Sequence, residues 1–324
     1  MEGSHTFAGD GQTSNPNEPA ACLTAAQAGA SQPLCFGPGA GQTRNTAQLR
    51  PYFASRGWTQ DLTYYHDGFD THYNGLQITI DKHFSHGLQM TANYAWQRAH
   101  NYGGDYQEID RKVNYGRYDD LREQQLTIFS NYDLPFGKNK MFGSRAPGFV
   151  DYIIGGFSLG SSLNYSGGLP FTPSYGECGS DIPAGPCMPN KIGSSRLPLN
   201  LTGFNPGTHT RSYFTPVAAF GNNGSTSGAF QRPALDNFGT VGRNSYFGPD
   251  FFNLDLSLIK NIRLYEGVTG QFRMDAFNAL NHINPGNPSS SCIDCSVGSN
   301  AGVITGEALG AAPRQLQFAA RINF

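Results

Sequence analysis

Apolar and polar residues alternate one for one along seven separate stretches of this sequence. In the first stretch Leu76, Ile78 and Ile80 stand between polar neighbours, and the other six stretches repeat the pattern. Successive side chains of an extended strand point to opposite faces, so each stretch predicts a β-strand with one apolar and one polar face. The seven predicted strands begin near residues 76, 88, 125, 157, 252, 268 and 315. No stretch of comparable length has the spacing of an amphipathic helix, so we expect an all-β fold.

Composition narrows the class of protein that these strands can build. Charged residues make up 14% of the 324 residues and apolar residues 38%, whereas an ordinary soluble domain has about 25% charged residues. The aromatic content of 13% argues against a disordered chain. The sequence has no run of roughly 18 apolar residues, which excludes a helical membrane protein. The net charge of −2 gives no basic surface for nucleic acid.

Two architectures fit alternating strands, the soluble β-sandwich and the transmembrane β-barrel. The polar faces are rich in Gln, Asn, Thr and Ser, which suits a hydrated lumen. The stretches run to about ten residues, the length a tilted strand needs to cross a bilayer, whereas soluble strands average five or six. Aromatic residues near the strand ends suit the girdles at the membrane interfaces. These residues are Tyr94, Trp96, Tyr132, Tyr165, Phe252 and Phe324.

Short and long connections alternate between the predicted strands. Residues 85–87 and 263–267 are short, residues 135–151 are intermediate, and residues 99–120, 166–250 and 281–313 are long. Outer-membrane barrels have short periplasmic turns and long outer loops. We therefore expect an antiparallel transmembrane β-barrel segment of about seven long meander strands with long extracellular loops, the largest at 166–250. Residues 1–72 form an extracellular region, and residues 73–324 form the C-terminal part of the barrel.

Seven strands do not close a single-chain bacterial barrel, because such barrels have an even number of strands. An open edge would leave backbone groups without hydrogen bonds in the hydrocarbon layer, which is costly. We therefore expect an incomplete barrel, the C-terminal piece of a larger one, with at least one further strand upstream. Met1 is followed by Glu-Gly-Ser-His, which lacks the apolar segment of a secretory signal.

Seven short runs within residues 73–324 share their order with a known family. They are 73–77 (Tyr-Asn-Gly-Leu-Gln), 132–137 (Tyr-Asp-Leu-Pro-Phe-Gly), 167–171 (Gly-Gly-Leu-Pro-Phe), 242–244 (Gly-Arg-Asn), 255–261 (Asp-Leu-Ser-Leu-Ile-Lys-Asn), 272–278 (Phe-Arg-Met-Asp-Ala-Phe-Asn) and the closing run from 313 (Pro-Arg-Gln-Leu-Gln-Phe). Together they resemble the C-terminal barrel of TonB-dependent outer-membrane receptors, specifically the Oar-like group.

The resemblance implies a receptor in the bacterial outer membrane that binds an extracellular ligand and takes it up with energy from the TonB system. Family barrels have 22 strands and an N-terminal plug, and we expect this sequence to be a part without plug, coupling box or signal peptide. The closing strand implies a signal for the outer-membrane assembly machinery at Phe318, Ile322 and Phe324. Membrane lipid and an unidentified ligand are the other expected partners. Two alternatives stay open, a passive porin or structural outer-membrane protein and a secreted β-sandwich that binds glycans.

The six cysteines fall as three pairs of near neighbours in predicted outer loops. This placement predicts local disulfides in an oxidising compartment. The alternative is a redox or metal site at Cys292-Ile293-Asp294-Cys295, but neither a helix after a strand nor four ligands accompany it. The predicted pairs are Cys22 with Cys35, Cys178 with Cys187, and Cys292 with Cys295.

Candidate contact residues lie on the polar faces and in the largest loop. Asp255, Arg273 and Asp275 share the polar parity and are predicted lumen charges that pair across neighbouring strands. A network that holds the register or meets a plug is the favoured interpretation, ahead of a ligand site. Ligand contacts are expected instead from the loop at 166–250, because surface loops commonly carry binding. Its candidate stacking rings are Tyr175, Tyr213, Phe214 and Phe220.

Nothing in the sequence places a nucleophile beside a base, so we expect no enzyme and no cofactor. The histidines form no HExxH motif, and no metal site is expected among them. Aspartates concentrated in two loops could hold Ca²⁺, which takes oxygen ligands, but a solvated acidic loop is the favoured interpretation. These aspartates are Asp67, Asp70, Asp105, Asp110, Asp119 and Asp120.

Overall fold

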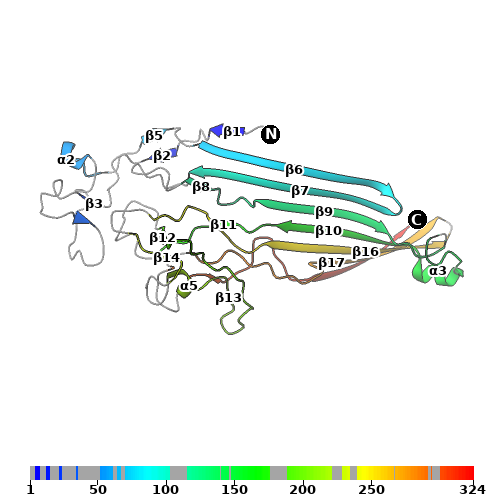
Figure 1. The fold of residues 1–324 in the computed structure, drawn as a ribbon. Helices are drawn as coiled ribbons and strands as arrows, with labels where there is room; N and C mark the ends of the chain where they lie inside the picture. Colours follow the sequence, from blue (N-terminus) through cyan, green and yellow to red (C-terminus); the bar gives the residue numbers. More distant parts are fainter. Residues whose placement is uncertain are drawn as a thin grey trace.

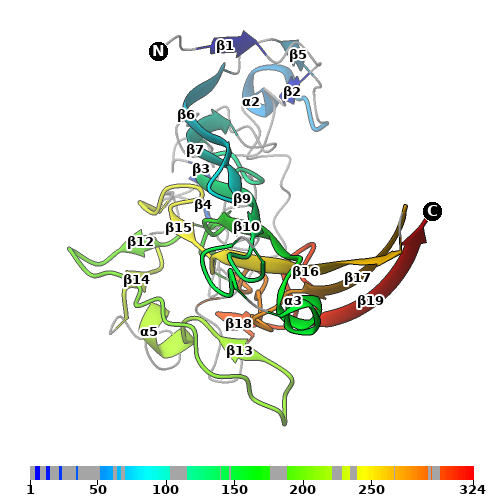
Figure 2. The ribbon, with the colours of Figure 1, turned by 90° about the vertical axis from the view of Figure 1, so that its right-hand side faces the viewer.

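The computed structural model of the chain is built around one curved antiparallel sheet, which we call the wall (Figure 1, Figure 2). It describes residues 4–7, 12–14, 22–23, 34–35, 52–60, 64–66, 70–102, 115–138, 140–145, 147–175, 188–220, 228–233, 239–265, 267–290, 293 and 300–324. The wall follows the order β1-β6-β7-β9-β10-β16-β17-β19, and β8 pairs with β7. Every pairing in the wall is antiparallel.

All seven strands predicted from the alternation are present, in sequence order. They are β6 (Asp70–Ser85), β7 (Leu88–Tyr102), β9 (Gln124–Asp133), β10 (Phe157–Ser166), β16 (Phe251–Tyr265), β17 (Val268–Phe277) and β19 (Gln315–Asn323). The short strands β1 (Ser4–Phe7) and β8 (Tyr115–Arg117) extend the wall beside β6 and β7. The two edges of the wall do not pair with each other within the described residues, so the barrel is open there.

The pleat separates the side chains of the wall into two faces. One row of facing residues is entirely apolar, and the next row is polar, as the pairing shows. Ile80, Ala92, Ile128, Leu163 and Leu254 form one apolar row, and Thr79, Asn93, Thr127, Asn164 and Asn253 form the adjacent polar row. Among the described residues no second sheet covers the apolar face, where Ile80 is 56% and Phe318 is 71% exposed. This arrangement confirms the transmembrane wall over the β-sandwich. We call the apolar face the outer face and the polar face the inner face.

The connections divide between the two ends of the wall as their lengths predict. At one end lie the tight turns after β6 and β16 and the connection from β9 to β10, which contains α3 (Gly148–Ile154) (Figure 1). The long loops lie at the opposite end. By the rule for outer-membrane barrels, the first end is the periplasmic end and the second is the outer end.

The described parts of the long loops 167–250 and 281–313 fold together into a small domain, which we call the cap. It holds three two-stranded sheets and the helix α5 (Pro216–Phe220). The sheets pair β11 (Pro170–Phe171) with β15 (Tyr246–Phe247), β12 (Asn190–Lys191) with β14 (Phe230–Gln231), and β13 (Arg211–Ser212) with β18 (Val303–Ile304). Its core contains the most deeply buried side chains of the described chain, among them Phe220, Phe230 and Ile293.

Short elements of the N-terminal region lie beyond the outer end of the wall (Figure 1). They are α2 (Phe53–Arg56), the strand β2 (Gln12–Ser14) paired with β5 (Tyr64–His66), and β3 (Cys22–Leu23) paired with β4 (Leu34–Cys35). In the described part of the chain, no helix has the length and apolar character needed to cross a membrane.

Candidate functional site: the inner face and the cap

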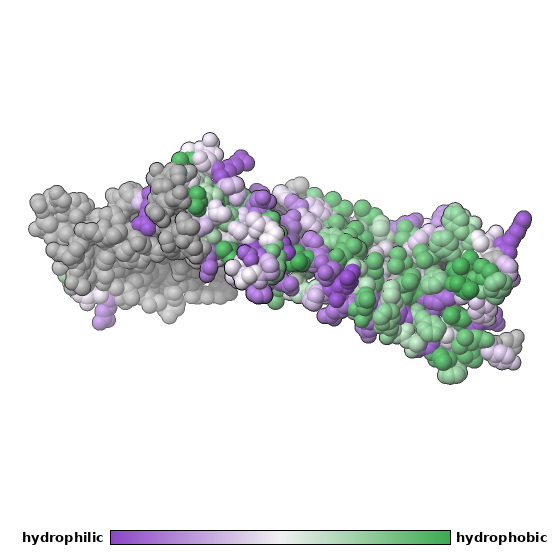
Figure 3. All heavy atoms as spheres, turned by 90° about the horizontal axis from the view of Figure 1, so that it is seen from below, coloured by the Kyte–Doolittle hydropathy of each residue, from purple (hydrophilic) through white to green (hydrophobic). Residues whose placement is uncertain are grey.

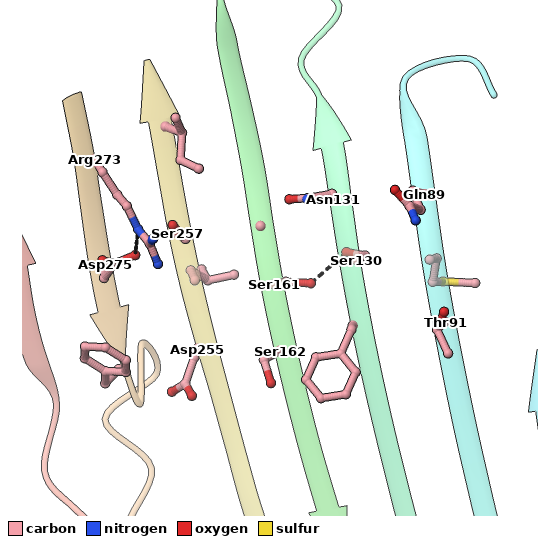
Figure 4. A pocket seen from close by; sticks show the side chains of 16 residues that line it. Gln89, Thr91, Ser130, Asn131, Ser161, Ser162, Asp255, Ser257, Arg273 and Asp275 are labelled. Carbon is pink, nitrogen blue, oxygen red and sulfur yellow. Dashed lines mark hydrogen bonds and ion pairs between the residues drawn. The ribbon is translucent and has the colours of Figure 1, made fainter. Parts of the chain in front are cut away.

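A shallow hollow of about 560 Å³ lies in the middle of the wall and spans β7, β9, β10, β16 and β17. Figure 4 shows its labelled side chains on these strands. Most of them belong to the inner face and are neutral hydrogen-bonding groups. They include Gln89, Thr91, Asn131, Ser162, Ser257 and the charged residues Asp255, Arg273 and Asp275. The hollow therefore offers water or a polar ligand many weak hydrogen bonds rather than one catalytic group.

The three predicted lumen charges come together at this hollow, but they pair differently from the prediction. The Nε of Arg273 donates a hydrogen bond to Oδ1 of Asp275 at 2.8 Å, within the same strand (Figure 4). Residues two apart on a strand share a face, which makes this contact local. Asp255 instead accepts from the side chain of Asn253 at 2.9 Å and from the backbone N–H of Asn278 at 2.8 Å. The expected charge pair across neighbouring strands is therefore wrong.

Hydrogen bonds between neutral side chains cross the inner face from strand to strand. Thr79 donates to Asn93 at 2.9 Å, and the hydroxyl of Tyr73 donates to Gln97 at 2.9 Å. Each bond satisfies a polar group on a face that would otherwise depend on water. The inner face is thus organised to hold its register while remaining wettable.

Sequence reasoning missed the apolar members of the inner face. Phe129, Ile259 and Phe277 line the hollow, and the first lies in one row with Thr91 and Ser162. Phe129 is 51% exposed there. Their positions along the strands could have predicted this, because they alternate in step with the polar residues and therefore lie on the same face. These side chains give the lumen an apolar contact beside its polar groups.

Three of the four rings predicted to stack on a ligand lie inside the cap. Tyr175, Phe214 and Phe220 are only 1–3% exposed. Phe214 stacks on Phe171, with ring centroids 6.1 Å apart and planes 8° apart. The structure therefore assigns these three rings to the core, which corrects their prediction as ligand contacts. Tyr213 packs at the edge of that core and is half-buried, so its contact with a ligand stays a prediction.

The cap also carries a surface groove of about 320 Å³ that sequence reasoning did not find. The ring of Phe204 lies against His209, with centroids 6.1 Å apart, and the guanidinium of Arg211 lies 5.9 Å from the Phe204 ring. Glu307 and Ile283 also line the groove. Its residues come from two loops separated by about 70 positions in the sequence. No local sequence motif could therefore predict the groove. The groove combines an aromatic surface with a cation, an acid and an imidazole.

Arg243 and Asn244 fasten the cap to the outer end of the wall. Arg243 donates to the side chain of Asn101 at 2.9 Å and forms an ion pair with Asp119. Asn244 donates to the backbone of Arg117 at 2.7 Å and has a positive φ of 54°. Asparagine tolerates this left-handed conformation better than most residues. Sequence reasoning noted the Gly-Arg-Asn run only as part of the family resemblance and missed its role as a clamp.

An ion-pair cluster reinforces the wall beneath this clamp. Glu123 accepts hydrogen bonds from Nε of Arg117 at 2.8 Å and from Nε of Arg98 at 3.1 Å. The Arg117 guanidinium also lies 4.8 Å from the ring of Phe247 in the cap. The shared carboxylate joins β7, β8 and the start of β9. The base of the cap therefore contacts an arginine that this ion-pair cluster holds in place.

The predicted cysteine pairs are described in part. Cys22 and Cys35 stand directly opposite each other as the Cα partners of the β3–β4 pair. Cys178, Cys187, Cys292 and Cys295 lie outside the described residues. The three disulfides stay predictions, which peptide mapping without reductant tests.

The predicted calcium loops are also described in part. Asp119 pairs with Arg243 and Asn244, and Asp70 begins β6. Asp67, Asp105 and Asp110 lie outside the described residues. In the part of the chain that is described, no group of three His, Cys, Asp or Glu side chains could hold a metal ion.

The predicted assembly signal lies on the last strand and on the residue that follows it. Phe318, Ile322 and Phe324 are 71%, 56% and 96% exposed. Phe318 faces Met274 of the outer face, and β19 pairs only with β17 among the described strands. The strand therefore presents an apolar row at an edge of the wall.

A comparison with known families agrees with this architecture. The family model of the outer membrane beta barrel domain matches residues 3–317. No curated protein matches the sequence. The matched range contains the cap and nearly all of the wall, whose exposed apolar face suits a bilayer. The chain therefore belongs to the outer membrane β-barrel domain family, and its place is the bacterial outer membrane.

Proposed function

We propose that the chain supplies the wall and outer domain of an Oar-like TonB-dependent receptor, which binds a solute outside the cell and takes part in its energised uptake. The observation that carries this proposal is the cap, a folded domain clamped to the outer end of the wall through Arg243 and Asn244. A receptor needs an ordered surface at its mouth to recognise a solute. The ordered set of family-like runs supports the same assignment.

The solute would first meet the groove of the cap. Phe204 offers a ring face, while Arg211 and Glu307 offer charges of both signs. A polar solute with a flat apolar part fits this chemistry, because rings stack on aromatic faces and polar groups fix the orientation. The inner-face hollow then offers hydrogen bonds along the route through the lumen.

Conductance in a planar bilayer tests the proposal on the protein purified from its own outer membrane. A TonB-dependent receptor carries a plug, so it should pass no steady current until the plug is released with denaturant. Cross-linking to the TonB protein in cells should give a complex that depends on an energised inner membrane. Steady open-channel steps without denaturant, together with no cross-link, would overturn the proposal in favour of a passive porin.

The passive porin is the second candidate, and the inner face favours it. Its groups are mostly neutral and hydrogen-bonded to one another, and they carry only a few charges. Such a surface suits a water-filled pore of broad selectivity. Conductance separates the two candidates, because the porin needs no plug to be displaced.

We also propose that β19 is the segment read by the assembly machinery. Its exposed Phe318, Ile322 and Phe324 form an apolar row at the edge of the wall. Truncation of Phe324 to Ala should lower the amount of folded protein in the outer membrane, measured by heat-modifiable migration in gels. The matched change Asn323→Ala alters the preceding residue, the last one of β19, and should leave that amount unchanged.

A further inference from the structure

The connection between β9 and β10 forms a compact projection at the periplasmic end, which we call the foot (described residues 135–138, 140–145 and 147–156). The carboxylate of Asp151 accepts the backbone N–H of Lys138 at 2.5 Å. Gly137 and Gly155 lie so close to this carboxylate that a Cβ at either position would come within 2.7 Å and 2.6 Å of it. Gly137 also has a φ of +112°, so both positions favour glycine. The foot is therefore a packed, hydrogen-bonded structure rather than a flexible linker.

The foot is held against the outer, apolar face of the wall. Lys260 has the outer-face parity and stands opposite Phe157 and Phe272. Its ammonium donates to the carbonyls of Ile153 and Gly155 at 3.0 Å and 2.6 Å. The hydroxyl of Tyr152 donates to the backbone carbonyl of Arg263 at 2.8 Å. Figure 1 shows α3 at this end of the wall, beside the ends of β10, β16 and β17.

The foot exposes large apolar side chains rather than burying them. Met141 is 79%, Phe149 is 70% and Ile153 is 67% exposed. In Figure 3 hydrophobic residues gather over the strand-bearing part of the molecule and continue to this end, with some polar residues among them. Exposed apolar patches of this kind mark contacts with a partner or a membrane. Their continuity with the lipid-facing surface selects the membrane.

The charges of the foot select the kind of lipid. Lys138, Lys140 and Arg145 are exposed, and none of the ion pairs between described residues involves them. Asp151 is the one acid of residues 135–156, and its carboxylate binds the backbone inside the foot. Three cations around an apolar surface are the pattern of a segment that lies in an anionic membrane interface.

The height of the apolar face leaves room for this contact. Along β10 the outer-face aromatic residues Phe157 and Tyr165 stand eight positions apart. Eight residues span about 27 Å along a strand, and a tilt near 40° reduces this to about 21 Å across the membrane. The apolar band of such barrels is about 25 Å tall. The apolar side chains of the foot supply the missing part at the periplasmic side.

We propose that the foot seats in the phosphate layer of the inner leaflet and binds anionic phospholipid there. Met141, Phe149 and Ile153 enter the acyl boundary, and Lys138, Lys140 and Arg145 contact the phosphates. The foot thereby fixes how deeply the wall sits in the membrane. The long side chains of the cations reach the phosphates while their stems stay among apolar groups.

The test is fluorescence quenching of the full chain refolded into vesicles of phosphatidylcholine with one quarter phosphatidylglycerol, where either lipid carries bromine. Phe149→Trp places a reporter on the foot, and Phe204→Trp is the matched control on an exposed ring of the cap. The natural Trp96 lies on the outer face and reports insertion of the wall. The unsubstituted chain gives the background of Trp58 and Trp96.

Brominated lipid should reduce the emission of the tryptophan at 149 at least twofold and leave the one at 204 unchanged. Brominated phosphatidylglycerol should quench it several-fold more per molecule than brominated phosphatidylcholine. The variant K138Q/K140Q/R145Q in the Phe149→Trp background should lose that preference and keep the quenching.

Equal quenching of the natural foot by both lipids overturns the anionic preference. A reporter at 149 that stays bright while Trp96 is quenched overturns the membrane contact and indicates a periplasmic protein as partner. If Trp96 also stays bright, the wall is outside the bilayer and the proposal fails with it.

Discussion

The wall and the cap are built from the same chain, but they hide their apolar side chains in opposite ways. Ile80 and Phe318 of the wall are 56% and 71% exposed, whereas Phe220 and Phe230 of the cap are 1% and 0% exposed. The wall relies on lipid as its second layer, and the cap supplies its own core. The stability of each region therefore depends on a different solvent, which separate substitutions can test.

The largest effect is expected in the core of the cap. Phe220→Ala should destabilise the cap by about 3–5 kcal/mol, because it removes a fully enclosed ring and leaves a cavity. Limited proteolysis should then cut within 167–250 while the wall keeps its heat-modifiable migration. Phe204→Ala removes an equally large but half-exposed ring and should change proteolysis little. Loss of the wall together with the cap would contradict the separation of the two regions.

The next largest effect is expected at the centre of the outer face. Ile80→Arg places a cation in lipid and should cost about 2–4 kcal/mol of folding free energy near the middle of the bilayer. Thr79→Arg alters the neighbouring residue, which faces the lumen and is also exposed, and should cost much less. Urea titration of the chain folded in lipid vesicles measures both. An equal loss of folding free energy in the two variants would show that both faces of the wall contact the same solvent.

A smaller effect is expected at the clamp between the two regions. Asn244→Ala removes the hydrogen bonds to Arg117 and Asp119 from a buried position and should cost about 1–3 kcal/mol. Hydrogen exchange should rise first at the base of the cap, near Thr172, whose hydroxyl also bonds Asn244. Arg196→Ala, at an exposed site of the cap, is the control. Unchanged exchange in the Asn244 variant would show that other contacts hold the cap.

The wall could be predicted from the sequence because its physics is local. A strand between lipid and water repeats its pattern every two residues, so residues 76–80 already reveal which side chain faces lipid. The exceptions Phe129 and Phe277 lie on the inner face, where an apolar residue costs little beside a neutral lumen. The predicted charge pair across neighbouring strands was wrong for a related reason. Arg273 and Asp275 are two residues apart on one strand and share a face, so they pair with each other.

The cap could not be predicted because its contacts join distant residues. The backbone N–H of Ile293 bonds the carbonyl of Ser174, and the N–H of Tyr213 bonds that of Gly302. Two loops with no regular period thus form one core, and no pattern within either loop reveals it. The same rings that suggest ligand stacking in an open loop become core residues when a second loop covers them.

The smallest effect is expected on the stability of the cap at alkaline pH. It bears on the difference between the two regions because the phenols concerned belong to the cap. Burial raises the pKa of Tyr213, to which Asp250 adds, and burial also raises the pKa of Tyr246. A phenol with a raised folded pKa stays protonated in the folded state, so its stabilising contribution is complete below pH 10, the ordinary value. That contribution falls as the pH rises through 10 toward the folded pKa, because the unfolded chain loses its proton first.

The melting temperature of the cap, followed by limited proteolysis between pH 8 and pH 11, should therefore decline above pH 10. The double variant Tyr213→Phe/Tyr246→Phe cannot ionise at these positions and should decline less. Absorbance of tyrosinate at alkaline pH, compared between this variant and the natural chain, measures the ionisation itself. An identical decline in both proteins would place the alkaline sensitivity outside the cap core. In that case the burial that distinguishes the cap from the wall would not govern how the stability of the cap depends on pH.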